Sequence, residues 1–396
     1  MSSLSTSTNR GFNQTTWDFA IIGAGPAGAI AAYQLARHSR KVLLLDKSQF
    51  PRYKVCGCCI NNSAQTALLE VGLQSILADS KAVPLNRFLL SDGCEKASVK
   101  VHNSVSISRS RFDQRLLEAA IDVGVTFRER ASAQVLRMSE DYCTLKVHDS
   151  LQDREFEIET KIALVADGLN GHALDLHQEF KAEVESASHI GAGIVLSDED
   201  KSYEAGTIYM ACGEGGYVGL VRLEDGRLDI AAALAPTFVQ RTGSPGAAAQ
   251  QLLEGNQMSV PQGLASGQWT GTQKLSRRRL QVGGQRLLVI GDASGYPEPF
   301  TGEGIGWALW SGILSARLVI NGIENWQPKI VEEWKNLHLQ FQKQQTRSSM
   351  IGRVLRNKVL RHGLVTALAR SPLLATSIVE LATHSNLSRM AQRSLR

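Results

Sequence analysis

The stretch WDFAIIGAGPAGAIAAYQLA, residues 17–36, joins an apolar run to three glycines in G-x-G-x-x-G spacing and then to an apolar helical pattern. This order predicts a strand at 19–22, a tight turn and a helix. In such a turn Gly23 permits the sharp bend, Gly25 lets the backbone approach a phosphate, and Gly28 allows the helix to pack closely on the strand. The helix N-terminus, with its unpaired N–H groups, is where a pyrophosphate binds. The stretch therefore predicts a dinucleotide site.

A carboxylate follows at the expected distance. A second apolar run, residues 41–45, ends in Asp46. In dinucleotide-binding βαβ units an acid at the end of the second strand accepts hydrogen bonds from ribose hydroxyls. Strand, turn, helix, second strand and terminal acid together make a chance glycine turn a poor explanation.

A second glycine turn, VIGDASGYPEPFTGEGIGWAL, lies about 270 residues later, at 289–309. Residues 287–290 read as a buried strand, and Pro299 and the glycines after it open a helix. The exposed N–H groups at that helix end would stabilise negative charge on the N1/O2 side of a reduced flavin. Asp292 is placed to bind a ribityl hydroxyl. FAD is long enough for one turn to hold its pyrophosphate and the other its ring, so the pair predicts FAD.

Five segments carry a family resemblance. They are GAGPAG at 23–28, FPRYKVCG at 50–57, SRSRFDQRLLEAA at 108–120, ALVADG at 163–168 and GDASGYPEPFTGEG at 291–304. In order and spacing they resemble FAD-dependent oxidoreductases of the geranylgeranyl reductase type, within the p-hydroxybenzoate hydroxylase-like flavoprotein superfamily.

The resemblance and the two turns imply a set of cofactor contacts. The residues expected at FAD are Gly23, Gly25, Pro26, Ala27, Gly28, Asp46, Arg52, Cys56, Gly57, Arg109, Asp167, Gly291, Asp292, Pro299, Gly302, Glu303, Gly304 and Ile305.

The resemblance also predicts an α/β fold with several parts. A Rossmann-like FAD-binding domain, discontinuous over 16–82, 100–180 and 276–322, would carry an inserted mixed or antiparallel β-sheet substrate domain. That substrate domain would comprise 83–99 and 181–275, where runs such as GTIYMA, YVGLVRL and LDIAAAL alternate like strands. Residues 1–15 are expected to form a flexible tail, and 323–396 a basic helical C-terminal region.

The segment FPRYKVCGCCINNSA is where the reaction chemistry is expected to be specified. In the family this element flanks the isoalloxazine, and Cys56 and Gly57 match its pattern. Cys56, Cys58 and Cys59 are therefore the candidate catalytic residues. Vicinal Cys58 and Cys59 could form a strained redox-active disulfide, and neighbouring cations could depress the pKa of Cys56. The alternative is that small residues simply pack against the flavin. No metal site is expected, because the other cysteines lack paired spacing.

Composition indicates an ordinary globular protein. The 396 residues are 43% apolar with a net charge of +5, and no apolar run of 18 residues indicates a membrane span. No secretory signal is evident, so a cytoplasmic location is expected. From Arg347 onward, nine cations face one acid, Glu380, and apolar residues recur beside them at helical spacing. Such helices could contact an anionic membrane peripherally or could pack their apolar face on the body of the protein. No nucleic-acid-binding motif accompanies the charge.

The substrate is expected to be a small hydrophobic metabolite. Tyr209, Cys212 and Tyr217, in IYMACGEGGYVGLV, are the candidate substrate contacts, since this segment stands where geranylgeranyl reductases often carry an aromatic Y-x-W-x-F-P element. The favoured reaction is reduction of an isoprenoid double bond, and the alternative is hydroxylation of a lipid-like phenol or polyketide in secondary metabolism. Halogenation and a non-enzymatic flavin or thiol redox sensor are further alternatives. NAD(P)H is a candidate electron donor, and the redox partner stays open.

Overall fold

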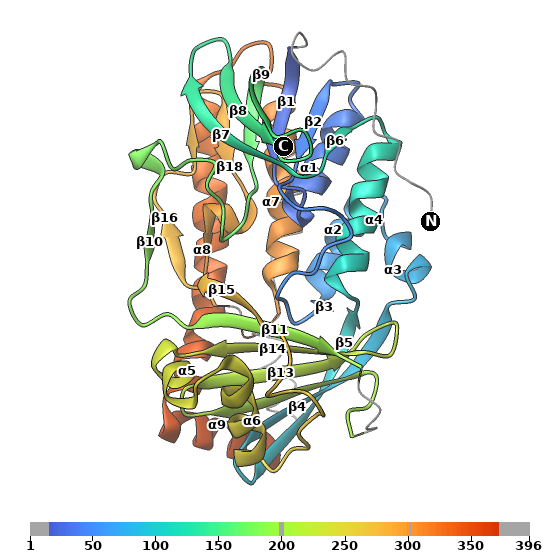
Figure 1. Cartoon of the computed structure of the whole chain (residues 1–396), viewed down its shortest axis with the longest axis vertical. Coiled ribbons are helices and arrows are strands. Elements are labelled where there is room, and N and C mark those ends of the chain that lie inside the picture. Colours follow the sequence, from blue (N-terminus) through green and yellow to red (C-terminus); the bar gives the residue numbers. More distant parts are fainter. Residues whose placement is uncertain (1–15, 198–201, 299, 301, 372–396) are drawn as a thin grey trace.

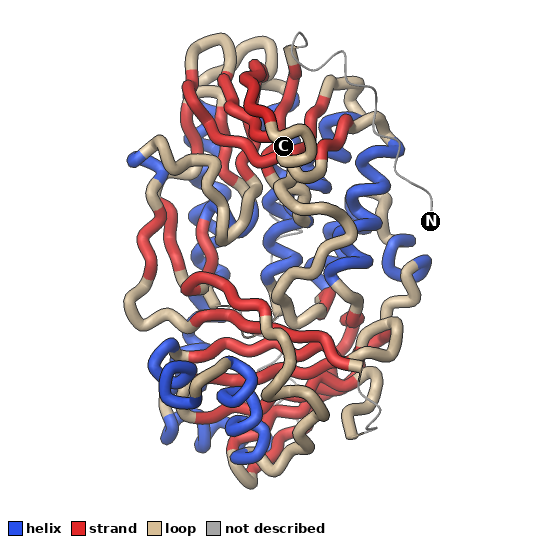
Figure 2. Tube along the Cα trace, viewed as in Figure 1, coloured by secondary structure: helices blue, strands red, loops and turns tan. Residues whose placement is uncertain are grey.

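The computed structural model describes residues 16–197, 202–298, 300 and 302–371. Figure 1 shows two sheets at opposite ends of an elongated molecule, and Figure 2 shows the helices lying between and beside them. The α/β fold with a Rossmann-like part and a second sheet is confirmed.

The first sheet is the predicted nucleotide-binding sheet. Its strand order is β17 (Gly283–Gly284), β18 (Leu287–Val289), β9 (Arg154–Val165), β1 (Trp17–Ile22), β2 (Val42–Leu45) and β6 (Thr126–Arg128). The strands from β18 to β6 run parallel. Their carboxyl ends therefore meet at one edge, where open α/β sheets bind ligands.

Both faces of this sheet are buried, which explains why its strands are continuously apolar. Helices α1 (Pro26–Ala36), α2 (Asn62–Glu70), α4 (Arg109–Asp122) and α7 (Gly304–Ile320) form one layer, and the short α3 (Ser75–Asp79) contacts α4. The other face is covered by β7 (Ala131–Met138) and β8 (Cys143–Asp149), which continue antiparallel from β9.

The second sheet is mixed and has eight strands. Its order is β15 (Thr270–Lys274), β11 (Ile190–Leu196), β14 (Leu228–Leu234), β13 (Gly216–Arg222), β12 (Thr207–Gly213), β4 (Val83–Asp92), β5 (Glu95–Ser106) and β3 (Cys59–Ile60). Helices α5 (Pro236–Thr242) and α6 (Pro245–Gly255) pack on one face. The opposite face looks toward the first sheet.

Two segments expected in the FAD-binding domain pair with strands of the second sheet. β5 continues to Ser106, past the boundary expected at residue 100, because it pairs with β4 over nearly its whole length. β3, in the segment after Cys56, also pairs with β5. The cysteine segment therefore belongs to both parts of the molecule.

Short elements connect the two sheets. β10 (Ala182–Val184), β16 (Arg277–Arg279) and β19 (Gly295–Tyr296) form a three-stranded antiparallel sheet, and 3-10 turns occupy Gln178–Phe180 and Gly291–Ser294. Ser108 begins α4 and bonds to the Glu224 carboxylate, at 2.8 Å through its N–H and 2.6 Å through its hydroxyl.

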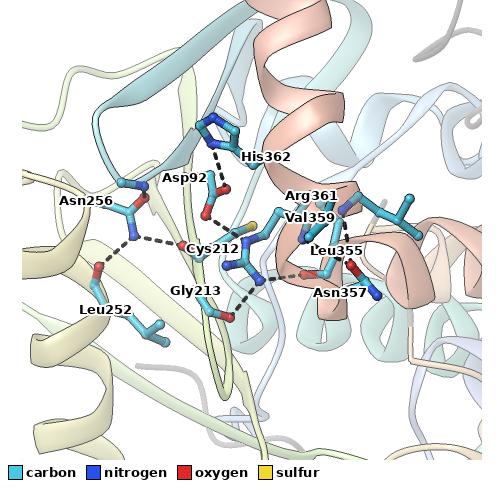
Figure 3. Close-up of polar contacts among 12 residues, drawn as sticks. Asp92, Cys212, Gly213, Leu252, Asn256, Leu355, Asn357, Val359, Arg361 and His362 are labelled. Atoms are coloured by element: carbon cyan, nitrogen blue, oxygen red, sulfur yellow. Dashed lines mark hydrogen bonds and ion pairs between the residues drawn. The ribbon is translucent and has the colours of Figure 1, made fainter.

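The C-terminal helices also connect the part of the molecule around the first sheet with the part around the second. α8 (Pro328–Arg356) contacts β17 and α7 of the first part, whereas α9 (Lys358–Arg370) packs on β5 and β4 of the second. In α9 the buried Arg361 donates to Asp92 and to the carbonyls of Gly213 and Leu355 (Figure 3). Residues 372–396 of the expected basic region lie outside the described residues. Among the described helices, none is both long and apolar enough to cross a membrane.

Candidate active site

A cavity of about 520 Å³ lies between the two sheets. One end is formed by the turn before α1 and by Asp46, and the middle by the segment 52–59 and the start of α7. The other end is formed by the inner face of the second sheet and by residues of α8 and α9. The two glycine turns of the sequence thus open into one space.

The first turn is shaped for a phosphate. Gly23 has φ +105°, which glycine adopts readily, and a Cβ on Gly28 would lie 1.8 Å from the Gly23 carbonyl oxygen. A Cβ on Gly25, by contrast, would have only the Arg52 guanidinium within reach, at 3.6 Å. The space above Gly25 is therefore open, and the α1 N-terminus and an arginine border it, as an anion requires.

Asp46 is fixed at the end of β2. It is buried, and its two carboxylate oxygens each accept a backbone N–H at 2.8 Å, from Ala24 and Ser48. These bonds tie the second strand to the first turn and hold the carboxylate at the cavity wall, where a ribose hydroxyl can reach it.

The second turn provides the ring end of the site. Gly302, Gly304 and Ile305 line the cavity where α7 begins, beside Tyr296. Asp292 also lines it and lies 3.7 Å from the Lys54 ammonium nitrogen. Burial lowers the pKa of Lys54, while the Asp292 charge acts to raise it.

A buried charge network supports the middle of the cavity. Arg109 binds the Asp113 carboxylate with two bonds, at 2.9 and 2.8 Å, and Arg52 approaches the same carboxylate at 3.3 Å. Burial acts to raise the pKa of Asp113, but the two guanidinium groups hold it below its ordinary value. Two cations share one carboxylate here, so positive charge remains to face the cavity.

Part of that charge acts on Cys56. A hydrogen bond from Cys58 and the Arg109 guanidinium lower the pKa of Cys56 to about 6, against the effect of burial. The same contact with Cys56, together with burial, raises the pKa of Cys58 well above its usual range. Burial likewise raises the pKa of Cys59, whose thiol donates to the Gly57 carbonyl at 3.0 Å. Within the cluster, Cys56 is therefore the thiol that loses its proton first.

A carboxyl group that the sequence reasoning missed lies against this cluster. Asp229, in β14, is 1% exposed, and neither of its carboxylate oxygens accepts a hydrogen bond from the described residues. Burial and the charge of Cys56 raise its pKa well above the usual range, while Cys58 acts to lower it. A single acid in the apolar run LDIAAAL was the available sequence signal, since buried carboxylates are rare without a role.

The far end of the cavity is apolar. Phe88, Leu90, Met210, Tyr217 and Phe300 form its wall on the sheet side, with the Tyr217 and Phe300 rings 5.0 Å apart. The C-terminal helices close this end with three leucines: Leu355, Leu364 and Leu368.

Most of the expected cofactor contacts meet in this cavity. Those that line it are Gly23, Gly25, Pro26, Asp46, Arg52, Cys56, Gly57, Arg109, Asp167, Asp292, Gly302, Gly304 and Ile305. Asp167, however, turns its carboxylate to the Ala173 N–H, 2.9 Å away, and burial raises its pKa. Its contribution is to shape the loop after β9.

Several expected residues lie elsewhere. Ala27, Gly28, Gly291 and Glu303 do not line the cavity; a Cβ on Gly28 would meet the Gly23 carbonyl oxygen, and a Cβ on Gly291 would meet the Ala27 side chain. Pro299 lies outside the described residues. Cys59 and Tyr217 line the cavity, whereas Cys58 is buried behind it.

Two of the three expected substrate contacts need correction. Strand alternation places Tyr209 on the opposite face of the sheet from Met210, where its ring packs 4.9 Å from that of Tyr203. Cys212 shares the face of Met210, but it is 2% exposed and packs in the apolar cluster under α9, so it does not reach the cavity. Of the three, Tyr217 alone lines the cavity.

The residues present fit FAD. The open space above Gly25, the Asp46 carboxylate and the second helix N-terminus all border one cavity, as the pyrophosphate, the adenosine ribose and the ring of FAD would require. Within the described part of the chain, no group of His, Cys, Asp and Glu residues is arranged to hold a metal ion.

Comparisons with known proteins agree with this assignment. A family model described as FAD binding domain matches residues 16–309. Conditioned medium factor receptor 1 of Dictyostelium discoideum is 26% identical over 78% of this chain, and the match spans 64% of that protein. Menaquinone reductase of Mycobacterium tuberculosis is 26% identical over 76% of both chains. Digeranylgeranylglycerophospholipid reductase of Methanocaldococcus jannaschii is 24% identical over 82% of this chain and 84% of its own.

Solved structures share the fold. A geranylgeranyl bacteriochlorophyll reductase-like protein from Thermoplasma acidophilum has a TM-score of 0.76 at 15% identity, covering 96% of this chain and 99% of its own. A p-nitrophenol 4-monooxygenase from Pseudomonas putida has a TM-score of 0.74 at 14% identity, covering 95% and 98%. At these identities the structures support the architecture alone. The matches together confirm the predicted FAD cofactor and the predicted resemblance to geranylgeranyl reductase-like flavoproteins.

Proposed function

The chain belongs to the FAD binding domain family and is an FAD-dependent oxidoreductase, and from this premise we propose that it reduces a carbon–carbon double bond in the isoprenoid chain of a lipid-like substrate. The observation that carries the proposal is the apolar end of the cavity, which opens directly onto the flavin end. Two relatives are reductases whose names specify menaquinone and a digeranylgeranylated glycerophospholipid.

Side chains at the two ends of the cavity would have different roles: those at the apolar end would bind the substrate chain, and those near the flavin would orient the double bond and supply a proton. Phe88, Leu90 and Phe300, with the leucines of α8 and α9, would bind an apolar chain and exclude water from it. When bound, FAD supplies hydride chemistry at N5. The protein then has to orient the double bond and deliver a proton to the second carbon.

Two phenols are placed to hold that proton. Tyr217 and Tyr296 line the cavity, and burial raises the pKa of each well above its ordinary value. Both hydroxyls therefore stay protonated at neutral pH. Cys56 lines the same cavity with a lowered pKa, so the two phenols are the groups better suited to hold a proton there.

Mass spectrometry tests the proposal. Holoprotein reduced anaerobically with dithionite is incubated with a menaquinone or a geranylgeranylated glycerolipid. A gain of two hydrogens in the prenyl-chain fragment of the product, measured after any menaquinol has been reoxidised to the quinone, supports reduction of a double bond. A product that forms with phenols, requires oxygen and gains one oxygen atom would instead establish the monooxygenase alternative. The same assay with NADPH or NADH in place of dithionite tests whether a nicotinamide is the electron donor.

We also propose that the C-terminal helices contact an anionic lipid surface. Met350, Val359 and Leu360 expose 59%, 79% and 54% of their surface, and exposed Arg353 and Lys358 lie in the same stretch. Apolar residues beside cations are typical of interfacial helices. Sedimentation with vesicles of phosphatidylglycerol checks this: a Val359→Asp, Leu360→Asp variant should lose binding, and equal binding of variant and wild type would refute it.

A further inference from the structure

We propose that Cys56 and Cys58 form a redox-active dithiol that exchanges two electrons with FAD, and that Asp229 is the buried acid that gives a proton to Cys58. This adds a second redox couple to the oxidoreductase. It does not depend on the identity of the substrate.

The thiols of Cys56 and Cys58 lie next to each other at the cavity wall. Cys56 lines the cavity, Cys58 lies directly behind it and is 2% exposed, and a hydrogen bond joins them. Gly57, between them, has open space around the position of a Cβ. The backbone at Cys58 has φ +51°, so the chain already turns sharply there.

The two thiols differ in how readily they lose a proton. Arg109 stabilises a thiolate at Cys56, whereas Cys58, remote from solvent, keeps its proton. Thiol–disulfide chemistry needs one sulfur as the nucleophile and leaving group and a second that carries the proton. Simple packing of small residues against a flavin requires no such difference.

A buried carboxyl group, that of Asp229, lies beside Cys58. Its neighbours across the sheet are Val221 on β13 and Val195 on β11, so it stands on the inner face of the sheet, two residues from Ala231, which lines the cavity. Val221 and Val195 also pack with Cys58. The Asp229 carboxyl therefore lies on the same packing layer as Cys58, which acts on its pKa, and it is buried without accepting a hydrogen bond from the described residues. A carboxyl group left in this state is costly unless it holds a proton.

The redox step is the transfer of two electrons between reduced FAD and the Cys56–Cys58 disulfide. Reduced FAD gives two electrons to the Cys56–Cys58 disulfide, and the Sγ–Sγ bond breaks. Cys56 leaves as the thiolate beside Arg109, and Cys58 takes the proton of the Asp229 carboxyl. The proton released by reduced FAD passes to solvent, and Asp229 regains one from solvent. The reverse sequence, with oxidised FAD as the oxidant, forms the disulfide.

An anaerobic reductive titration of the holoprotein tests the proposal. After treatment with diamide and removal of the reagent, the wild type should take up about four electrons per FAD, two for the flavin and two for the disulfide. The variants Cys56→Ser and Cys58→Ser should take up about two. Cys94→Ser, which removes an exposed thiol outside the cavity wall, is the matched control and should retain about four.

Peptide mass spectrometry of the wild type gives a readout that needs no variant. The oxidised protein should yield a peptide with Cys56 and Cys58 that is two hydrogens lighter and cannot be alkylated at either residue. Two free thiols there, together with uptake of about two electrons per FAD, would overturn the proposal. A bond between Cys58 and Cys59 instead, with Cys56 free, would also overturn it.

The role of Asp229 has its own test. Asp229→Asn should keep the capacity of about four electrons, while reduction of the disulfide by reduced flavin slows by at least about tenfold, because the acid that protonates Cys58 is gone. Asp225→Asn, at an exposed position before the same strand, is the control. An unchanged rate in Asp229→Asn would remove Asp229 from the step.

Discussion

The guanidinium of Arg361 donates to the carboxylate of Asp92 at 2.7 Å, and this ion pair fastens α9 to the end of β4 (Figure 3). Both side chains are almost fully buried. Because Leu364 and Leu368, on the same helix, line the apolar end of the cavity, the pair holds in place one wall of the proposed substrate site.

Removing Arg361 should therefore loosen that wall. Arg361→Ala leaves Asp92 buried without its main partner, so we expect a loss of about 3–5 kcal/mol in the free energy of unfolding. Urea denaturation of the holoprotein measures it. Arg370→Ala, an exposed position on the same helix, should change stability by less than about 0.5 kcal/mol. Equal stability of the two variants would contradict the structural role of the pair.

The first turn makes a prediction with two distinguishable outcomes. Gly28→Ala should destabilise the protein, because its Cβ would meet the Gly23 carbonyl at 1.8 Å. Gly25→Ala has no such clash, so the apoprotein should keep its stability but lose FAD affinity by about tenfold or more, because the methyl group occupies the space of a phosphate. Thermal unfolding and flavin fluorescence titration separate the two effects. Unimpaired FAD binding by Gly25→Ala would place the pyrophosphate elsewhere.

Cys56 should show the reactivity of a thiolate below neutral pH. With its pKa near 6, its rate of alkylation by iodoacetamide should rise between about pH 5 and 7 and then level off, since only the thiolate reacts. In Cys58→Ala, which removes the hydrogen bond to the thiolate, the rise should move to higher pH. Peptide mass spectrometry at each pH follows the residue. A rise that stays below pH 7 in Cys58→Ala would show that Cys58 does not set the pKa.

A charge at the apolar end should act on substrate binding and not on FAD. Leu364→Asp places a carboxylate in the cavity wall, and we expect KM for a prenylated substrate to rise by about tenfold or more. Ala369→Asp, an exposed position later on the same helix and outside the residues proposed for lipid contact, is the matched control. Both variants should bind FAD like the wild type. Equal KM values in the two variants would move the substrate site away from α9.

The sequence allowed prediction of the cofactor end of the site in some detail. The spacing of Gly23, Gly25 and Gly28 and the acid at the end of β2 are local requirements of phosphate and ribose binding, so they are visible without coordinates. The glycines at the start of α7 are visible in the sequence for the same reason.

The substrate end was less predictable because it depends on register and on distant packing. Which face Tyr209 takes follows from its pairing with β4 and β13, and local composition does not specify it. The leucines of α8 and α9 reach the cavity only through tertiary contacts such as the Arg361–Asp92 pair. Asp229 could have been noticed as one acid in an apolar strand, but its proximity to Cys58 depends on how the two sheets face each other.

The most direct test of the central claim is an anaerobic single turnover. Holoprotein carrying one equivalent of reduced FAD is mixed with a menaquinone or a geranylgeranylated glycerolipid, and flavin absorbance near 450 nm and product mass are followed together. We predict that flavin reoxidation and a gain of two hydrogens in the prenyl chain proceed at the same rate without oxygen. Flavin that stays reduced until oxygen is admitted, with an unchanged prenyl chain, would contradict the account.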